Sequence, residues 1–191
     1  MSRLSYWSAF TLEVLMAERE VPKVIILLVM SLVTAVYICA LTIVNVALPQ
    51  MQGALSATPD QISWVITLNL VATAVATPLT GWLVSRWGQR QTLIWCIIGF
   101  TITTYLCAIA TSLEPLLIYR IGQGAFGAPL VPIAQAVILK TFKEPDKRAI
   151  AMSIWGMSVV IGPGLAPALG GYMAEEYSWR WTFYLLIPVC L

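Results

Sequence analysis

Arg120 is the one charged residue inside an apolar stretch long enough to cross a bilayer. An ionisable side chain within a membrane span is costly to bury and marks a functional site by default. If its span is centred near Gly127, Arg120 lies about 10 Å from the midplane, at 1.5 Å per residue. Facing the bundle interior, it would attract an anionic group or shift the pKa of a proton-carrying carboxylate. Facing outward, it would extend to the outer interface. The sequence leaves both orientations open.

Uncharged amide side chains occur within the same apolar stretches. Those that could line a cavity are Asn45, Asn69, Gln123 and Gln135. Each could instead hydrogen-bond a neighbouring helix, an interaction worth about 0.6 kcal/mol on average in membrane proteins. The first three, with Arg120 and Gly124, are the candidates for a coupling or substrate site.

A stripe of small residues marks the fifth apolar stretch. Gly162, Ala166 and Gly170 recur every four residues, so they share one helix face that another helix can approach closely. Pro163 and Pro167 stand beside the stripe and remove backbone hydrogen bonds. Tight packing and bending during a conformational cycle are both compatible with this pattern.

The residue types that are missing exclude several kinds of chemistry. The chain has no histidine, and no aspartate or glutamate falls within an apolar stretch. Intramembrane proteases need such residues, so we expect no enzyme activity, no metal and no cofactor. The isolated cysteines are Cys39, Cys96, Cys107 and Cys190, which favours neither disulfides nor a metal cluster. A net charge of +2 gives no basic field for nucleic acid.

Membrane-spanning helices must position these residues. Apolar residues make up 59 % of the chain and charged residues 10 %, against about 45–50 % and about 25 % in soluble domains. We therefore expect an all-α, polytopic membrane helix bundle, with a cytoplasmic segment at 1–23 and a membrane domain at 24–191. The expected spans are about 24–48, 61–84, 92–110, 116–138, 149–169 and 181–191, the last one truncated. A capping box, Thr58-Pro59-Asp60-Gln61, opens the second helix.

Basic residues predict the orientation. With a cytoplasmic N-terminus, nine of the eleven lysines and arginines lie on the cytoplasmic side, and only Arg180 lies in an outer loop. This is the positive-inside pattern of a cell-membrane (inner or plasma membrane) protein. Tryptophans are expected at both interfaces, where their rings prefer to lie. Those at helix ends are Trp64 and Trp179 on the outer side and Trp82, Trp87 and Trp95 on the inner side.

One internal repeat is readable. Residues 81–92 align with residues 171–182 at a constant offset of 90, with glycine, aromatic, arginine and threonine positions in step. Three spans separate the copies, so they point in opposite directions across the membrane. Inverted three-helix repeats are typical of secondary transporters.

Five motifs resemble the major facilitator superfamily, and within it the multidrug exporters of the EmrB/QacA type. They are Thr42-Ile-Val-Asn-Val-Ala-Leu-Pro49, Gly81-Trp-Leu-Val-Ser-Arg-Trp-Gly-Gln-Arg90, Arg120-Ile-Gly-Gln-Gly124, the segment from Gly162 to Gly171, and Ser178-Trp-Arg-Trp181. The resemblance covers nearly the whole chain from Val24 onward.

The resemblance implies roles for matching residues. The loop after span 2 would be a cytoplasmic gate, formed by Gly81, Arg86, Gly88 and Arg90. Arg120 and Gly124 would belong to the coupling site. The pliant segment of an antiporter would comprise Gly162, Pro163, Ala166, Pro167, Gly170 and Gly171.

Three positions depart from the family pattern. Ser85 and Ala40 stand where the family usually has aspartate, and Ala166 stands where glycine is usual. With Ser85, the gate arginines lose a charge partner. With Ala40, the first span loses a proton carrier.

The resemblance predicts proton-coupled export of drugs or other small amphipathic compounds. A truncated or degenerate non-transporting membrane subunit and an uncoupled metabolite facilitator stay open as alternatives. Family transporters have two halves, so the expected partners are a small-molecule substrate, the lipid bilayer and a C-terminal half that this chain lacks.

Overall fold

The computed structural model describes residues 22–190, and all regular structure in that part of the chain is helical. The long helices are α2 (Lys23–Ala54), α3 (Pro59–Trp87), α4 (Gln89–Ile109) and α7 (Pro145–Glu176). Shorter helices are α5 (Leu113–Gly127), α6 (Leu130–Thr141), α8 (Trp181–Tyr184) and α9 (Ile187–Cys190). Helices α5 and α6 together form one apolar segment, so five segments are long and apolar enough to cross a membrane. Most of the N-terminal segment predicted at 1–23 lies outside the described residues.

Local sequence explains where the helices begin. At the start of α3, the amide of Gln61 donates to Thr58 Oγ1 at 3.3 Å, and the amide of Thr58 donates to Gln61 Oε1 at 3.0 Å. Pro59 occupies the first turn. The predicted capping box is thus confirmed. It satisfies amide groups that the helix itself leaves unpaired.

The helices are longer than the apolar spans, because a helix does not have to end where hydrocarbon ends. Helix α2 continues through Pro49, and α7 continues through Pro163 and Pro167. Proline is tolerated inside membrane helices because neighbouring groups satisfy the freed backbone carbonyls. The fourth apolar segment is interrupted between α5 and α6, at Ala128 and Pro129, where proline removes a backbone hydrogen bond.

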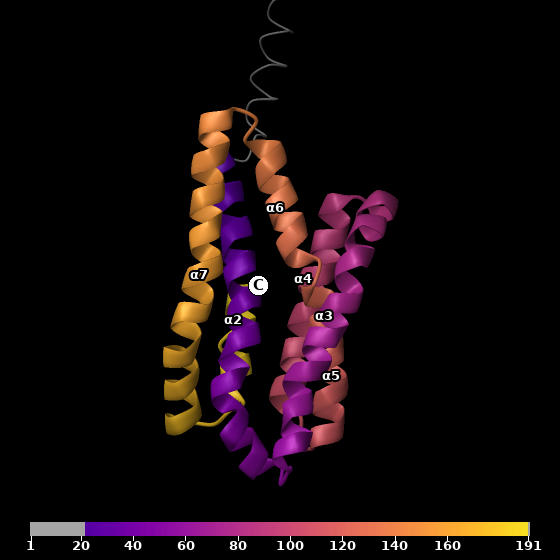
Figure 1. Ribbon diagram of the computed structural model, residues 1–191, viewed down its shortest axis with the longest axis vertical. Coiled ribbons are helices and arrows are strands. Elements are labelled where there is room, and N and C mark those ends of the chain that lie inside the picture. Colours follow the sequence, from indigo (N-terminus) through magenta and orange to yellow (C-terminus); the bar gives the residue numbers. More distant parts are fainter. Residues whose placement is uncertain (1–21, 191) are drawn as a thin grey trace, which may run out of the picture.

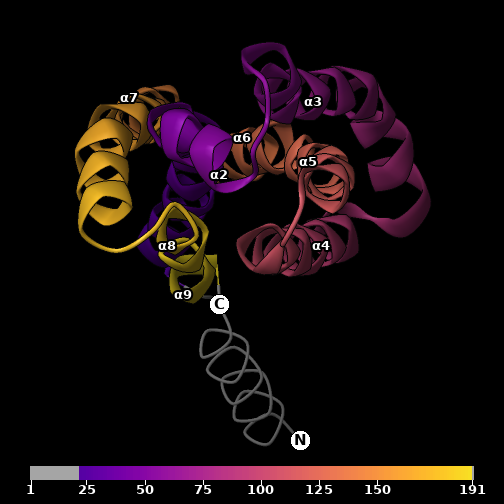
Figure 2. The same cartoon turned by 90° about the horizontal axis from the view of Figure 1, so that it is seen from below.

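Two groups of helices form the bundle. Figure 2 shows α2, α7, α8 and α9 in one group and α3, α4 and α5 in the other, with α6 between them. The most extensive helix contacts join α2 to α7 and α3 to α5. The turns on either side of α3 lie at opposite ends of the bundle (Figure 1), so successive segments run antiparallel.

The helix bounds reproduce the inverted repeat. An offset of 90 moves α2 onto residues 113–144, which cover α5 and α6, and moves α3 onto residues 149–177, which match α7. When the two repeats are exchanged at this offset, the contact between α2 and α7 corresponds to the contact between α5 and α3. The fold is therefore built from inverted three-helix repeats, and the short helices α8 and α9 follow the fifth membrane segment.

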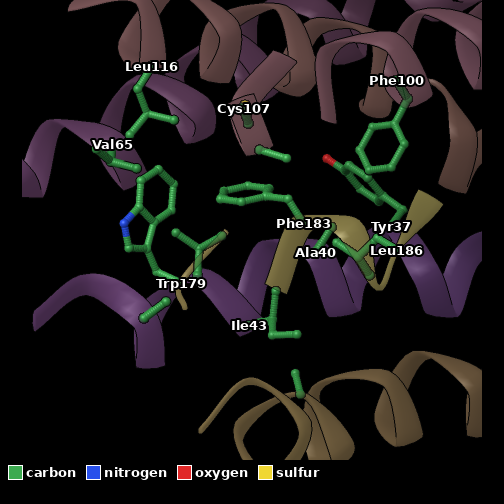
Figure 3. Packing of buried hydrophobic residues seen from close by; sticks show 14 of the residues in the cluster. Tyr37, Ala40, Ile43, Val65, Phe100, Cys107, Leu116, Trp179, Phe183 and Leu186 are labelled. Carbon is green, nitrogen blue, oxygen red and sulfur yellow. The ribbon is translucent and has the colours of Figure 1, made fainter. Parts of the chain in front are cut away.

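Helix α8 and the turn before it fill part of the core. Phe183 is fully buried and points between Cys107 of α4 and Ile43 of α2 (Figure 3). Trp179 packs edge-to-face on Phe183, with ring centroids 6.3 Å apart. Arg180 lies over the Trp179 ring and donates from Nη2 to Ala110 O at 2.8 Å. These contacts tie the start of α8 to the C-terminal end of α4.

Tryptophan placement partly differs from the prediction. The other four helix-end tryptophans are about half exposed or more, as interfacial rings should be, but Trp179 is 2 % exposed. Its placement at the outer interface was therefore wrong. The indole is buried because it lies in the core beside Val65 (Figure 3) and packs on Phe183.

Candidate functional site

Arg120 lies inside the bundle and is 1 % exposed. Its Nε donates to the backbone carbonyl of Val65 on α3 at 3.1 Å. Its Nη1 donates to Gln123 Oε1, one turn along α5. The guanidinium therefore faces the protein interior, and the alternative orientation toward the outer interface does not occur in this structure.

Gln123 connects Arg120 to a third helix, α4. Its Nε2 donates to Thr104 Oγ1 on α4 at 2.7 Å, and that hydroxyl donates to the carbonyl of Phe100 at 2.7 Å. Gln123 and Thr104 are both fully or almost fully buried. A continuous polar chain thus connects α3, α5 and α4 through the Arg120 side chain.

Asn69 adds a second link between α3 and α5. Its Nδ2 donates to the backbone carbonyl of Arg120 at 2.8 Å, and its side chain is 1 % exposed. Its Oδ1 is buried and has no hydrogen-bond partner among the described residues. Buried polar atoms are normally paired, so this acceptor is available to a donor group or a water molecule that enters the network. We call Arg120, Gln123, Asn69 and Thr104 the Arg120 network.

Gly124 lets the two helices of the network approach closely. A Cβ at this position would lie 3.1 Å from both Ala72 Cβ and Thr73 Oγ1, and closer still to the backbone oxygen of Asn69. No side chain larger than hydrogen fits there without moving α3 away from α5. The glycine therefore positions Arg120 against α3.

No carboxylate neutralises Arg120 within residues 22–190. The six acidic side chains of that segment are all exposed: Asp60, Glu114, Glu144, Asp146, Glu175 and Glu176. Backbone and amide oxygens are the acceptors that the structure gives the guanidinium. A buried cation held only by neutral acceptors is costly, which favours a functional role over a structural one.

Two of the predicted amides do not join the network. Asn45 is exposed on α2, and Gln135 is half-buried on α6. They occupy equivalent positions in the two repeats, at the offset of 90. Sequence spacing could not distinguish them from Asn69 and Gln123, since all four stand in apolar stretches.

The predicted gating loop forms the turn between α3 and α4. Gly88 adopts φ of 81°, a conformation that favours glycine, and so allows the reversal. Gly81 is exposed, and a Cβ added to it would meet nothing within 4 Å. Arg86 lies 6.0 Å from the centre of the Trp82 ring, and Arg90 is exposed. Neither arginine pairs with an acidic side chain of residues 22–190.

Gln89, the first residue of α4, connects this turn to α6. Its Nε2 donates to Ile133 O at 3.3 Å, and Lys140 Nζ donates to Gln89 Oε1 at 2.9 Å. These bonds join the first repeat to α6 of the second. Gln89 was not among the predicted site residues, and Lys140 entered only the prediction of orientation, although both lie at the same predicted end of the bundle.

We expect Gln89→Ala to lower the free energy of unfolding by about 1 kcal/mol, a drop of about 2–4 °C in the thermal midpoint of a chain this size. Gln91→Ala is the matched control, since Gln91 is exposed and has no side-chain hydrogen bond to the described residues. Thermal unfolding of the purified chain in detergent measures both. Equal midpoints for the two variants would show that the Gln89 contacts do not stabilise the fold.

The small-residue stripe of α7 packs on α2. A Cβ on Gly162 would lie 2.7 Å from Ala35 O, and one on Gly170 would lie 2.6 Å from Ile43 Cγ1. Ala166, between them, is fully buried. Gly171 is less tight, at 3.7 Å from Val46 Cγ1. The predicted packing face is therefore confirmed, with Pro163 and Pro167 beside it on the less buried faces of α7.

A hydrogen bond fixes the same contact in the N-terminal halves of both helices. Trp155 Nε1 on α7 donates to Thr34 Oγ1 on α2 at 3.0 Å. At the offset of 90, these positions correspond to Val65 and Gly124, where α3 meets α5 beside Arg120. Val65 O accepts from Arg120 and Gly124 O accepts from Thr73, so both repeats have polar contacts near these positions, made with different partners.

Trp155→Phe removes the indole donor but keeps an aromatic ring. We expect it to cost about 1 kcal/mol of stability, since buried Thr34 then loses a hydrogen-bond partner. Trp95→Phe, at a site that is 62 % exposed, is expected to leave the thermal midpoint unchanged. Identical midpoints for both variants would argue against this contact.

An inverted-repeat bundle around a buried polar network defines the class of membrane transport proteins. Residues 30–191 match the Major Facilitator Superfamily, and the chain belongs to this family. It is 39 % identical to the multidrug export protein EmrB of Escherichia coli (strain K12) over 166 residues, covering 87 % of this chain and 32 % of that protein. It is 41 % identical to the fatty acid resistance protein FarB of Neisseria gonorrhoeae over 148 residues, covering 78 % of this chain and 29 % of that protein.

A solved structure shows the same fold. A bacterial homologue of the human lysosomal transporter Spinster, in an inward-facing and unoccupied conformation, superposes with a TM-score of 0.71 at 22 % identity. The match covers 88 % of this chain and 40 % of that one. The chain spans about a third of the length of the curated relatives cited above. These relatives are named for export and resistance, not for an enzymatic reaction.

Proposed function

We propose that this chain is the N-terminal part of a secondary transporter that exports small amphipathic compounds from the cytoplasm. The observation that carries the proposal is the Arg120 network, a buried cation without a carboxylate partner in residues 22–190, within an inverted-repeat bundle. The names of the related multidrug and fatty acid resistance proteins support the substrate class. Arg120, Gln123, Gly124 and Asn69 are the proposed coupling or substrate residues, with exposed Asn45 as a candidate cavity residue.

The mechanism would be alternating access. The two halves of such a transporter rock around a site near the bilayer midplane. The close α2–α7 and α3–α5 contacts would let each pair move as a unit, with the Gly88 turn and the prolines of α7 allowing the bending between states. The second half, supplied by sequence beyond this chain, would complete the cavity.

We propose an orientation with the N-terminus in the cytoplasm of a cell-membrane protein. Seven basic residues of the described chain lie at one end of the bundle, where α2 begins and where the α3–α4 and α6–α7 turns lie (Figure 1): Lys23, Arg86, Arg90, Lys140, Lys143, Lys147 and Arg148. Arg180 lies at the other end. Basic residues favour the cytoplasmic side.

Proton exchange would drive export. A proton-coupled exporter needs a buried group that can take up and release a proton. All six acidic side chains of residues 22–190 are exposed, so none of them is such a group. This observation favours a second candidate function, a facilitator without proton coupling.

Efflux of a fluorescent amphipathic dye from cells that express the full-length gene product tests both functions. Outward dye movement that stops when an uncoupler collapses the proton gradient supports the exporter. Movement that ignores the gradient supports the facilitator. Efflux equal to that of cells without the protein would contradict both.

A further inference from the structure

A pocket of about 440 Å³ lies at the basic end of the bundle, where the beginning of α2 meets the turn between α6 and α7. Its lining residues are Lys23, Thr141, Phe142, Lys143, Glu144 and Lys147. The volume is within the range of about 300–1,000 Å³ that is usual for ligand pockets. The Arg120 network contributes no residue to it, so the transport proposal leaves this pocket unexplained. We call it the lysine pocket.

The lining carries a net positive charge. Three lysines face one acidic residue, Glu144, whose carboxylate accepts from Lys147 Nζ at 2.8 Å. The pKa of Glu144 is lowered, mainly by this hydrogen bond and the charge of Lys147, and further by the charge of Lys23. Lys23 and Lys147 lie on different helices and both line the pocket, so positive charge in excess of Glu144 is gathered at one place.

The backbone adds further donors for an anion. Helix α7 begins at Pro145, directly after Glu144, and no side chain caps its first amide groups. The N-terminus of a helix carries a partial positive charge and unpaired N–H groups. Both features are combined here with a cavity and three lysines, which is the chemistry that binds phosphate groups.

The location indicates where the phosphate comes from. In the proposed orientation the lysine pocket lies at the cytoplasmic interface, where anionic lipid headgroups are found. Immediately beyond Lys23, Val24 is 62 % exposed, and one turn into α7 Ile150 is 62 % exposed. These apolar side chains offer a path for acyl chains beneath a bound headgroup. Basic pockets between helices on this side of a membrane bind lipid headgroups.

We propose that the lysine pocket binds the phosphate group of an anionic phospholipid. The lysines supply charge, the start of α7 supplies amide donors, and the neighbouring apolar surface holds the acyl chains. This site goes beyond the proposed transport function. It rests on the proposed orientation, which places the pocket at the cytoplasmic interface, and not on any transport step.

Native mass spectrometry of the purified chain in neutral detergent tests the proposal, because it counts bound lipids without any transport. The probes are phosphatidylglycerol, zwitterionic phosphatidylcholine and inorganic phosphate. We expect phosphatidylglycerol to bind at least about tenfold more tightly than phosphatidylcholine. Equal binding of the two lipids, or binding of inorganic phosphate without preference for the lipid, would overturn the assignment.

Matched variants locate the site. A surface lysine contributes about fivefold to the binding of anionic lipid, so Lys23→Gln with Lys143→Gln should weaken phosphatidylglycerol binding about 20- to 30-fold. Arg90→Gln with Arg148→Gln removes the same charge from the same end of the bundle, outside the pocket, and should weaken binding less than about threefold. Lys143→Arg should retain binding. Equal losses in the two double variants would mean that general surface charge, and not this pocket, holds the lipid.

Discussion

Arg120→Met is expected to lower transport by the full-length protein at least about tenfold while it leaves the protein folded. The guanidinium is buried without a carboxylate partner in residues 22–190, so its removal relieves a desolvation cost as well as breaking hydrogen bonds. Methionine fills a similar volume without charge. We therefore expect the thermal midpoint to change by no more than about 4 °C. Replacing a residue that lowers stability but is needed for activity removes the activity and leaves the fold intact.

Two comparisons make this prediction specific. Arg120→Ala should impair transport far more than Arg86→Lys, because Arg86 is exposed and keeps its charge in that variant. Gln123→Leu should lower transport less than Arg120→Met, because the cation remains. Full activity in Arg120→Ala would remove the network from the mechanism. A collapse of the fold in Arg120→Met would assign Arg120 a structural role instead.

Gly162→Ala and Gly164→Ala are expected to change stability in opposite directions, although they lie two residues apart on α7. A Cβ on Gly162 would lie 2.7 Å from the backbone oxygen of Ala35, so α7 must move away from α2. Such overpacking costs about 1–3 kcal/mol. A Cβ on Gly164 would meet nothing within 4 Å, and alanine favours the helix over glycine by up to about 1 kcal/mol.

Thermal unfolding of the two purified variants measures this contrast. We expect the midpoint of Gly162→Ala to fall by about 3–10 °C and that of Gly164→Ala to stay level or rise. Transport by Gly162→Ala should fall as well, since the α2–α7 pair would no longer move as one unit. Equal midpoints in the two variants would show that α7 does not pack on α2 through this face.

Much of the fold could be predicted from local patterns. Hydropathy gave the five membrane segments, and the capping box gave the start of α3. The repeat at an offset of 90 predicted an inverted arrangement that the helix bounds reproduce. These features depend on neighbouring residues or on a fixed offset, so they can be read without knowing which helices touch.

Features that depend on contacts between distant helices could not be predicted in the same way. Whether Arg120 faces inward is decided by Val65, 55 residues earlier in the chain. Asn69 and Asn45 look alike in sequence, yet one is buried beside Arg120 and the other is exposed. Trp179 was expected at the interface because a helix end is near it, whereas the tertiary fold buries its ring.

Transport by purified protein tests the central claim most directly. The full-length gene product would be reconstituted into liposomes, and movement of an amphipathic dye would be followed after a pH gradient is imposed, with Arg120→Met as the comparison. We expect dye movement well above that of empty liposomes for the unmodified protein, and movement at least about tenfold slower for the variant. Dye movement no faster than in empty liposomes, or equal in the two proteins, would contradict it.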